Sequence, residues 1–202
     1  MVIYNKTGNL IPQGRVTIER VYDDFSTEYP SWLNIEGSKS VNSNDSLVLT
    51  KGTLSAIKLS SKLYLFSGYD AIQLELGNYM KSTLSSIDGF SIESEDSTSK
   101  IEIKNISTAA NSDIGIYQDG VLIETIKQLD LTWNISVNKP CTYTVNYNIL
   151  HGSLTLLSNG CVIREIFLAT KLPLNKKYRI GFNSTSSTIT MSQIILRLWK
   201  SI

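Results

Sequence analysis

The chain has 202 residues, which is enough to bury a large core in one domain without metals or disulfides. Its 19 basic and 18 acidic residues leave a formal net charge of +1, and no run of Lys or Arg is long enough to follow a phosphate backbone, which argues against nucleic acid as a partner. No apolar stretch approaches the roughly 20 residues that cross a bilayer, so we expect no membrane partner.

Taken in chain order, the sequence alternates apolar and polar residues with a period of two, between turns rich in Gly, Asn, Asp and Ser. This pattern is typical of strands buried on one face. The predicted strands lie near residues 2–4, 15–21, 47–50, 54–59, 69–76, 89–95, 101–106, 114–118, 121–127, 130–137, 142–149, 153–158, 161–168, 177–183 and 189–199. About fourteen strands suit two packed antiparallel sheets of roughly six or seven strands each. No segment shows a convincing helical stripe, and residues 78–87 are expected to hold one short helical turn at most.

Two of these strands show the alternation most clearly. In DAIQLEL, the Ile and Leu residues share one face, while Gln73 and Glu75 share the other. In TYTVNYNI, the tyrosines and Val145 alternate with Asn146 and Asn148. A strand that faces a core on one side and solvent on the other has this pattern, so the amides and the carboxylate are predicted to point outward.

The turns between strands carry their own signals. The Asp-Gly pair at 119–120 and the Asn-Gly pair at 159–160 tolerate the positive φ angles of a tight hairpin turn. The Ser/Asn/Asp clusters at 38–46, 94–99 and 184–188 are predicted to be loops.

Five stretches, in this order, resemble the concanavalin-A-like lectin/glucanase superfamily: VYDDFSTEYPSWLNIEGSKSVNSNDSLVLT, GTLSAIKLSSKLYLFSGYDAIQLEL, YTVNYNILHGSLTLLSNGCVIREI, KYRIGFN and ITMSQIILRLW. They look like its entry strands, a strand pair leading into the concave sheet, a meander with an Asn-Gly hairpin, and two closing strands. The resemblance covers nearly the whole chain from about residue 15. It implies an all-β, antiparallel two-sheet β-sandwich (a jelly roll) as a single domain over 1–202, with an N-terminal arm at 1–14.

The resemblance also gives an interpretation of the stretch DDFSTEYPSW. It makes Phe25 and Trp32 packing residues and places Asp23 and Asp24 at a strand edge or turn. The alternative is a calcium site that uses Asp23, Asp24 or Asp45, which would require several oxygen ligands to converge. Apart from such a calcium ion, the sequence predicts no metal and no cofactor.

The acid motif of the glucanases is missing. Those enzymes carry Glu-x-Asp-x-Glu on one strand, where a period of two places all three carboxylates on one side of the sheet. The nearest stretch here, SIESEDS, puts Glu93 and Glu95 on one face but Ser97 in the third position, and KIEIKN puts Glu102 beside Lys104. We therefore expect no catalytic residues and no enzyme. Glu93 and Glu95 are either a solvated strand end or a pair that contacts a ligand.

Other reactive or aromatic residues give weaker signals. The only histidine, His151, lies in a His-Gly turn, which gives no support for a Ser-His-Asp device. Cys141 and Cys161 lack metal-binding spacing, and we expect two unpaired thiols in a reducing compartment, although the sequence also allows a disulfide. Trp133 shares its face with apolar residues and is predicted to lie in the core. Trp199 is predicted to be exposed or to contact a partner subunit.

Members of the superfamily without the acid motif commonly bind sugars on the concave sheet or its rim loops. Amides and carboxylates can bond sugar hydroxyls, and an aromatic face can take the C–H side of a ring. We therefore predict a non-catalytic carbohydrate-binding module. The candidate ligand-binding residues are Tyr69, Gln73, Glu75, Ser91, Glu93, Tyr117, Asn146 and Asn148. A solvated sheet face without any ligand would show the same polar residues.

The biological setting rests on the N-terminus. MVIYNKTGNLIPQGR has neither the apolar region nor the cleavage site of a secretory signal, so we expect a protein made in the cytoplasm, or a piece cut from a longer one. A sugar-binding jelly roll of this kind resembles lectin-like modules of bacteriophage tails and baseplates. That implies a virion location, or an extracellular one after lysis, with a host cell-surface glycan as ligand. Other virion proteins or copies of the chain would be partners, in contact with residues 1–4 or Trp199.

Two alternatives stay open at this point. One is a structural virion module with the same fold and no ligand. The other is a divergent glycoside hydrolase that uses Glu93 with Glu95, or Glu75.

Overall fold

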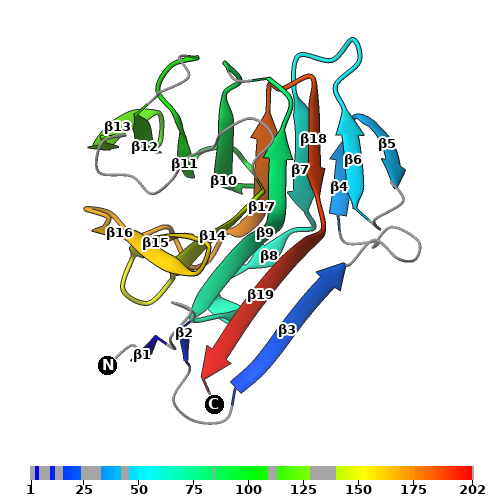
Figure 1. Ribbon diagram of the computed structural model, residues 1–202. Helices are drawn as coiled ribbons and strands as arrows, with labels where there is room; N and C mark the ends of the chain where they lie inside the picture. The colour runs from blue at the N-terminus through cyan, green and yellow to red at the C-terminus, as the bar shows by residue number, and fades with distance from the viewer. Residues whose placement is uncertain are drawn as a thin grey trace.

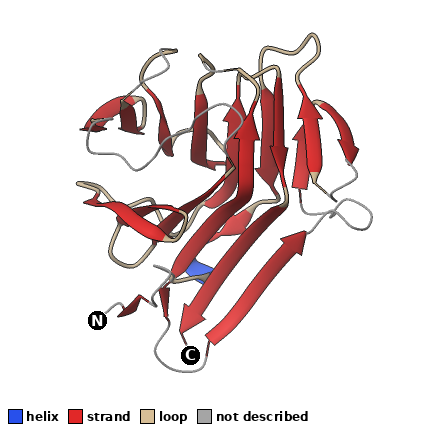
Figure 2. Ribbon diagram, viewed as in Figure 1, coloured by secondary structure: helices blue, strands red, loops and turns tan. Residues whose placement is uncertain are grey.

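The computed structural model describes residues 3–4, 10–11, 16–23, 33–41, 46–83, 85–108, 113–127 and 140–201. Strands dominate this part, which has a single 3₁₀ turn, η1 (Phe66–Gly68), and no α-helix (Figure 2). The strands are β1 (Ile3–Tyr4), β2 (Leu10–Ile11), β3 (Val16–Asp23), β4 (Leu33–Glu36), β5 (Ser38–Val41), β6 (Leu47–Thr50), β7 (Ile57–Ser61), β8 (Tyr64–Leu65), β9 (Ala71–Lys81), β10 (Asp88–Ser94), β11 (Lys100–Asn105), β12 (Ile114–Gln118), β13 (Val121–Ile126), β14 (Cys141–Asn148), β15 (Ser153–Ser158), β16 (Cys161–Phe167), β17 (Lys177–Ser184), β18 (Thr188–Met191) and β19 (Gln193–Ser201). The described residues include no helix with the length and apolar character needed to span a membrane.

The strands form two large antiparallel sheets, apart from β1 and β2, which pair only with each other (Figure 1). The β10 sheet has the order β13-β12-β11-β10-β17-β7-β4, with β8 beside β17. The β9 sheet has the order β16-β15-β14-β9-β18-β6-β5, and β19 joins it by pairing with β9 while β3 pairs with β19. The predicted fold class, an antiparallel two-sheet β-sandwich, is confirmed.

The inner faces of the two sheets supply the core. On β14, Tyr143, Val145 and Tyr147 are buried in one apolar cluster, as the alternation predicted. From η1, Phe66 stacks on Tyr178 of β17, with ring centroids 4.0 Å apart. The Phe66 ring centroid also lies 6.1 Å from that of Tyr147 on β14 of the other sheet. Aromatic side chains bury large areas, and such ring pairs add about 0.5–1.5 kcal/mol beyond the area term, so these contacts help to hold the two layers together.

Most predicted strands are present, but several short ones were not expected. The loop predicted at 38–46 contains β5, and β4 and β8 have no counterpart among the predicted strands. These strands have only two to four residues, which is too short for a period of two to stand out from the surrounding loops. The region 78–87 contains no helical turn among its described residues, because β9 continues to Lys81. The range 189–199 is two strands, with a break at Ser192.

The two hairpin turns have the expected backbone. Asp119 and Gly120 have φ angles of 51° and 82°, and Asn159 and Gly160 have 49° and 79°. Positive φ at both central residues is the requirement of a type I′ turn, so the Asp-Gly and Asn-Gly prediction is confirmed.

Some predictions fall outside the described residues. They concern Asp24, Phe25, Trp32, Asp45 and Trp133, and for Asp23 only the backbone, at the end of β3, is described. The calcium hypothesis and the packing roles of these aromatics therefore stay predictions. Elsewhere in the described chain, no group of three His, Cys, Asp or Glu side chains could hold a metal ion.

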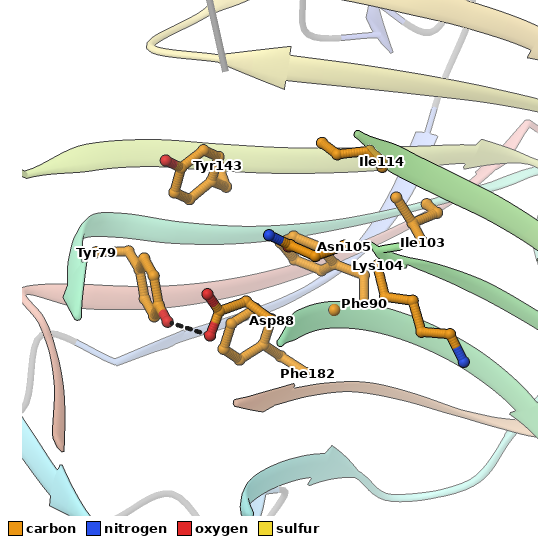
Figure 3. A pocket seen from close by; sticks show the side chains of 10 residues that line it. Tyr79, Asp88, Phe90, Ile103, Lys104, Asn105, Ile114, Tyr143 and Phe182 are labelled. Atoms are coloured by element: carbon orange, nitrogen blue, oxygen red, sulfur yellow. Dashed lines mark hydrogen bonds between the residues drawn. The ribbon is translucent and has the colours of Figure 1, made fainter. Parts of the chain in front are cut away.

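A buried ion pair connects the two sheets. Lys81 Nζ at the end of β9 lies 2.9 Å from Asp88 Oδ2 at the start of β10, and both side chains are almost fully buried. Asp88 also accepts hydrogen bonds from the Tyr79 hydroxyl (3.0 Å), from Ser86 and from Ser184 on β17. Figure 3 shows Tyr79 and Asp88 joined beside Phe90, Tyr143 and Phe182, around a cavity of only about 10 Å³. This network is satisfied internally and is best explained as a structural link.

Two edge strands, β13 of the β10 sheet and β16 of the β9 sheet, lie on the same side of the sandwich (Figure 1). Arg164 on β16 bonds Glu124 on β13, with Nε 2.8 Å from Oε1, which ties the two edges together. Around this contact several apolar side chains are exposed, among them Val121 and Phe167 at 65% and 70%.

Candidate functional site

The predicted site residues do not form one site. Gln73, Glu75, Asn146 and Asn148 belong to β9 and β14 of the β9 sheet, whereas Ser91, Glu93 and Tyr117 belong to β10 and β12 of the β10 sheet. All but Tyr69 point away from the core, but on opposite outer faces of the sandwich. Tyr69 follows η1 and packs, half-buried, against the core cluster.

The polar face of the β9 sheet is closed. Gln73 and Asn146 are 0% and 1% exposed, so the expectation of an open hydrophilic layer there is wrong. In register, Arg197, Gln73 and Asn146 lie side by side across β19, β9 and β14. The Arg197 guanidinium donates to Gln73 Oε1 and lies 3.3 Å from Glu75 Oε2. Gln73 and Asn146 are therefore buried, and Gln73 and Glu75 are bonded to Arg197, while the buried Asn146 Oδ1 accepts no hydrogen bond from the described residues. Ligand contact by Gln73, Glu75 or Asn146 stays a prediction.

Three more sequence predictions, on Asn148, on Trp199 and on the two cysteines, can be compared with the structure. Asn148 Oδ1 accepts the His151 backbone N–H (3.0 Å), so it stabilises the His-Gly turn. Trp199 is 6% exposed, which makes the idea of an exposed contact residue wrong. Cys141 is buried with Sγ 3.0 Å from Ser158 Oγ, while Cys161 is exposed, and the two thiols are not bridged, as expected.

The outer face of the β10 sheet, by contrast, carries a groove of about 350 Å³. Residues from β4, β7, β17, β10 and β11 line it, including the predicted residues Ser91 and Glu93. The inner sides of the same strands bury Phe90, Ile92 and Phe182 in the core. The alternation along each strand therefore holds the groove rigidly above a packed interior.

The groove is hollow because the middle of this face has small side chains. Ser60, Gly181 and Ser91 are neighbours in register on β7, β17 and β10. A Cβ atom on Gly181 would lie 2.8 Å from the Leu59 carbonyl oxygen and 3.2 Å from Ser91 Oγ, so the position has no room for a side chain. Beyond Ser91 the same row continues with Glu102 and Tyr117, whose larger side chains close that end.

Ion pairs line both sides of this floor. On one side Lys58 Nζ lies 3.1 Å from Glu36 Oε2. On the other, Lys100 Nζ lies between two carboxylates, 3.6 Å from Glu93 Oε2 and 3.3 Å from Glu102 Oε1. Each of these three groove glutamates is thus engaged by a lysine.

On the strands around the groove, four polar side chains that line it have no bond of their own within the described part of the chain. Two are the floor hydroxyls of Ser60 and Ser91, and two are on β17, Arg179 and Asn183. Donors and acceptors on a rigid sheet that lack internal partners can bond a ligand without giving up existing contacts.

Tyr117 stands at the edge of this face. A Cβ atom on Gly115 would lie 2.6 Å from a ring carbon of Tyr117, so the ring covers that glycine. The Lys104 ammonium is 4.8 Å from the ring centroid, and Lys104 also lies 3.4 Å from Glu102 Oε2. The aromatic ring of Tyr117 therefore lies next to the row of polar residues that contains Ser91 and Glu102.

Glu95, the partner expected for Glu93, does not line the groove. β10 ends at Ser94, and Glu95 is exposed in the turn that follows. Next to it, Asp96 accepts hydrogen bonds from Ser94 Oγ (2.7 Å), from the Lys176 ammonium (2.9 Å) and from Thr98. These hydrogen bonds hold the pKa of Asp96 well below its usual range, which marks a stable turn and not a catalytic acid.

Most groove residues were missed by the sequence reasoning. KYRIGFN signals Arg179 and Asn183 as outward, because Tyr178, Ile180 and Phe182 alternate with them. That signal does not tell which strands lie beside β17. The pairing of β17 with β10 on one side and β7 on the other is what assembles the site.

Comparison with known proteins identifies the fold. No protein-family model and no curated protein matches the sequence. Among solved structures, winged bean acidic lectin complexed with methyl-α-D-galactose matches at a TM-score of 0.62 and 12% identity, over 92% of this chain and 100% of that one. A point mutant of the Emp46p carbohydrate recognition domain matches at 0.62 and 14%, over 96% and 98%. Bacillus licheniformis β-glucanase matches at 0.59 and 11%, over 89% and 97%.

These matches show that the chain has the concanavalin-A-like jelly-roll fold, as the sequence resemblance implied. Lectins and a glucanase share that fold, so the likeness by itself does not separate sugar binding from sugar cleavage.

Proposed function

We propose that this chain is a carbohydrate-binding module whose ligand lies in the groove of the β10 sheet. The observation that carries the proposal is the set of four polar side chains around the floor that have no internal bonds in the described chain: Ser60, Ser91, Arg179 and Asn183. Hydroxyls, an amide and a guanidinium suit sugar hydroxyls, and a volume of about 350 Å³ falls within the roughly 300–1,000 Å³ of small-ligand sites.

A glycan array tests this proposal. The wild type is expected to bind at least one glycan class, and Asn183→Ala is expected to weaken that binding by about tenfold, because one or two hydrogen bonds are lost. Asn175→Ala is the matched control, since Asn175 is an exposed asparagine that does not line the groove. The proposal fails if the array shows no binding, or if both variants bind as the wild type does.

Glycan cleavage is the second candidate, and one observation favours it. Glu93 and Glu102 lie in the same groove and both contact Lys100, so their carboxylates are near each other. Incubation with polysaccharides and measurement of new reducing ends tests it. Cleavage that is lost in Glu93→Gln would replace the binding proposal with an enzyme, whereas intact polymers would leave binding as the function.

We also propose that the module belongs to a virion, made in the cytoplasm and found outside after lysis. A host surface glycan would be its ligand, and other virion proteins or copies of the chain its partners. The support is compositional: loops rich in Ser, Asn and Thr, and two cysteines that are not bridged. Mass spectrometry of purified particles is the test, and particles that lack its peptides would refute the setting.

A further inference from the structure

One cation in the groove has no carboxylate partner. Arg179 is exposed on β17, directly opposite Glu93 of β10 in register, yet its guanidinium makes no ion pair in the described chain. Glu93 is instead paired with Lys100 on its other side. The arginine therefore stands at the wall of the groove with its five donors available.

The two lysines that line the groove, Lys58 and Lys100, are already neutralised. Lys58 pairs with Glu36, Lys100 with Glu93 and Glu102, and Lys104 with Glu102. Among the described residues that line the groove, Arg179 is therefore the one charged side chain without an ion pair; Lys177, two positions earlier on the same face, does not line the groove. A lysine in this set would have to give up its glutamate before it could bind an anion, whereas Arg179 would lose only water.

The neighbours of Arg179 fit a ligand with both neutral and anionic parts. Gly181 and Asn183 follow it at every second position of β17, so Arg179 and Asn183 are about 13 Å apart along the strand, with the bare floor between them. A ligand that contacts both is longer than one sugar ring. Its neutral part can lie over Gly181 and bond Ser91 and Asn183, while its charged part reaches the guanidinium.

We propose that the groove selects a glycan that carries an anionic substituent, a carboxylate, sulfate or phosphate, and that Arg179 binds this group. The proposal rests on the proposed function and names its ligand class. A guanidinium offers a planar pair of donors that matches these oxyanions, and bonds to charged groups are roughly twice as strong as neutral ones. Selection of the anionic glycan therefore depends on Arg179, because the charges of the paired lysines are already neutralised by glutamates.

The test uses glycans that differ only in charge. An array with neutral, carboxylated, sulfated and phosphorylated glycans is probed first. Titrations then compare tetragalacturonate with its methyl ester, and a κ-carrageenan tetrasaccharide with its desulfated form. Binding is expected only among the anionic glycans, and these arms tell a carboxylate from a sulfate, while the array reports phosphate. Raising the salt concentration should weaken that binding.

Variants at one position complete the test. Arg179→Gln is expected to lose at least about tenfold in affinity for the anionic glycan, and Arg179→Lys to lose less, because the charge stays but the two-donor geometry goes. Arg164→Gln, on the other sheet, is the control and should bind as the wild type does. Because Arg179 and Arg164 are both exposed, circular dichroism should show all three variants folded.

Two results would overturn the inference in different ways. If the wild type binds a neutral glycan as tightly as its charged counterpart, or if Arg179→Gln binds the anionic glycan unchanged, the charge selection is wrong while sugar binding stands. If the array shows no glycan bound at all, the proposed function itself is wrong, and the inference falls with it.

Discussion

At the scale of single residues, the groove depends on side chains that are short or missing. Ser60, Gly181 and Ser91 leave the centre of the sheet low, while the ion pairs around them rise on both sides. The outward direction of Ser91 and Glu93 could be predicted from alternation alone. The lack of an ion pair at Arg179 could not be predicted, because it depends on the lysine of the neighbouring strand that pairs with Glu93.

Gly181→Ala tests the importance of this missing side chain. The new Cβ atom would lie 2.8 Å from the Leu59 carbonyl oxygen, closer than such contacts allow, so the strands must shift. We expect the free energy of unfolding to fall by about 1–3 kcal/mol and glycan binding to weaken. Urea unfolding measures the first effect. Gly68→Ala is the control, since nothing lies within 4 Å of its added Cβ atom, and equal stabilities of the two variants would contradict the prediction.

At the scale of elements, prediction succeeded where a strand has a strong pattern and a marked turn. β14 alternates over eight residues, and β15 and β16 are joined by the Asn-Gly turn at 159–160. β5 reads as a polar loop, because SKSV has no apolar face to recognise. Its existence depends on the backbone of β6 beside it, which is a partner that local sequence does not reveal.

The link between β9 and β10 gives a prediction at this scale. Lys81→Met would leave the Asp88 carboxylate buried without its cation, and we expect a loss of about 3–5 kcal/mol in the free energy of unfolding. Lys127→Met is the control, because the pair of Lys127 with Asp113 is largely exposed and should contribute at most about 1 kcal/mol. Chemical denaturation compares the two. Similar small losses in both would mean that Asp88 does not need Lys81.

At the scale of the whole molecule, the two outer faces of the sandwich differ in how far their polar side chains are exposed. The sequence predicted one hydrophilic outer layer, but its polar residues are divided between the two faces, of which one is buried around Gln73 and Asn146 and the other is grooved. Period-two alternation tells that Gln73 and Asn146 point away from the core. It cannot tell whether such a face meets solvent, because polar side chains can also bond one another, as Arg197 and Gln73 do.

Alkaline pH should destabilise the molecule through its buried tyrosines. Burial raises the pKa of Tyr79, Tyr143 and Tyr147, and raises that of Tyr178 to about 12. Unfolded tyrosines ionise near pH 10, so above that pH the unfolded chain loses protons that the native chain keeps. We therefore expect the tyrosine contribution to the free energy of unfolding to be constant up to about pH 10 and to fall from there towards pH 12.

Urea unfolding at pH 8 and pH 11, with tyrosinate absorbance followed in parallel, checks this. Tyr178→Phe should reduce the fall between the two pH values, because one of the contributing hydroxyls is gone. A native protein whose tyrosines all ionise near pH 10, with unchanged stability, would contradict the expectation.

The strict alternation along β10 and β17 also bears on how such a molecule can diverge. Ile92 and Ile180 maintain the architecture from inside, while Ser91 and Arg179, one position away, meet whatever arrives from outside. Substitutions at the outward positions can therefore change which ligand is bound and leave the core packing intact. The residues that maintain the fold and the residues that meet a ligand alternate along the same strands. Proteins that descend from one ancestor can therefore keep this fold and recognise quite different molecules.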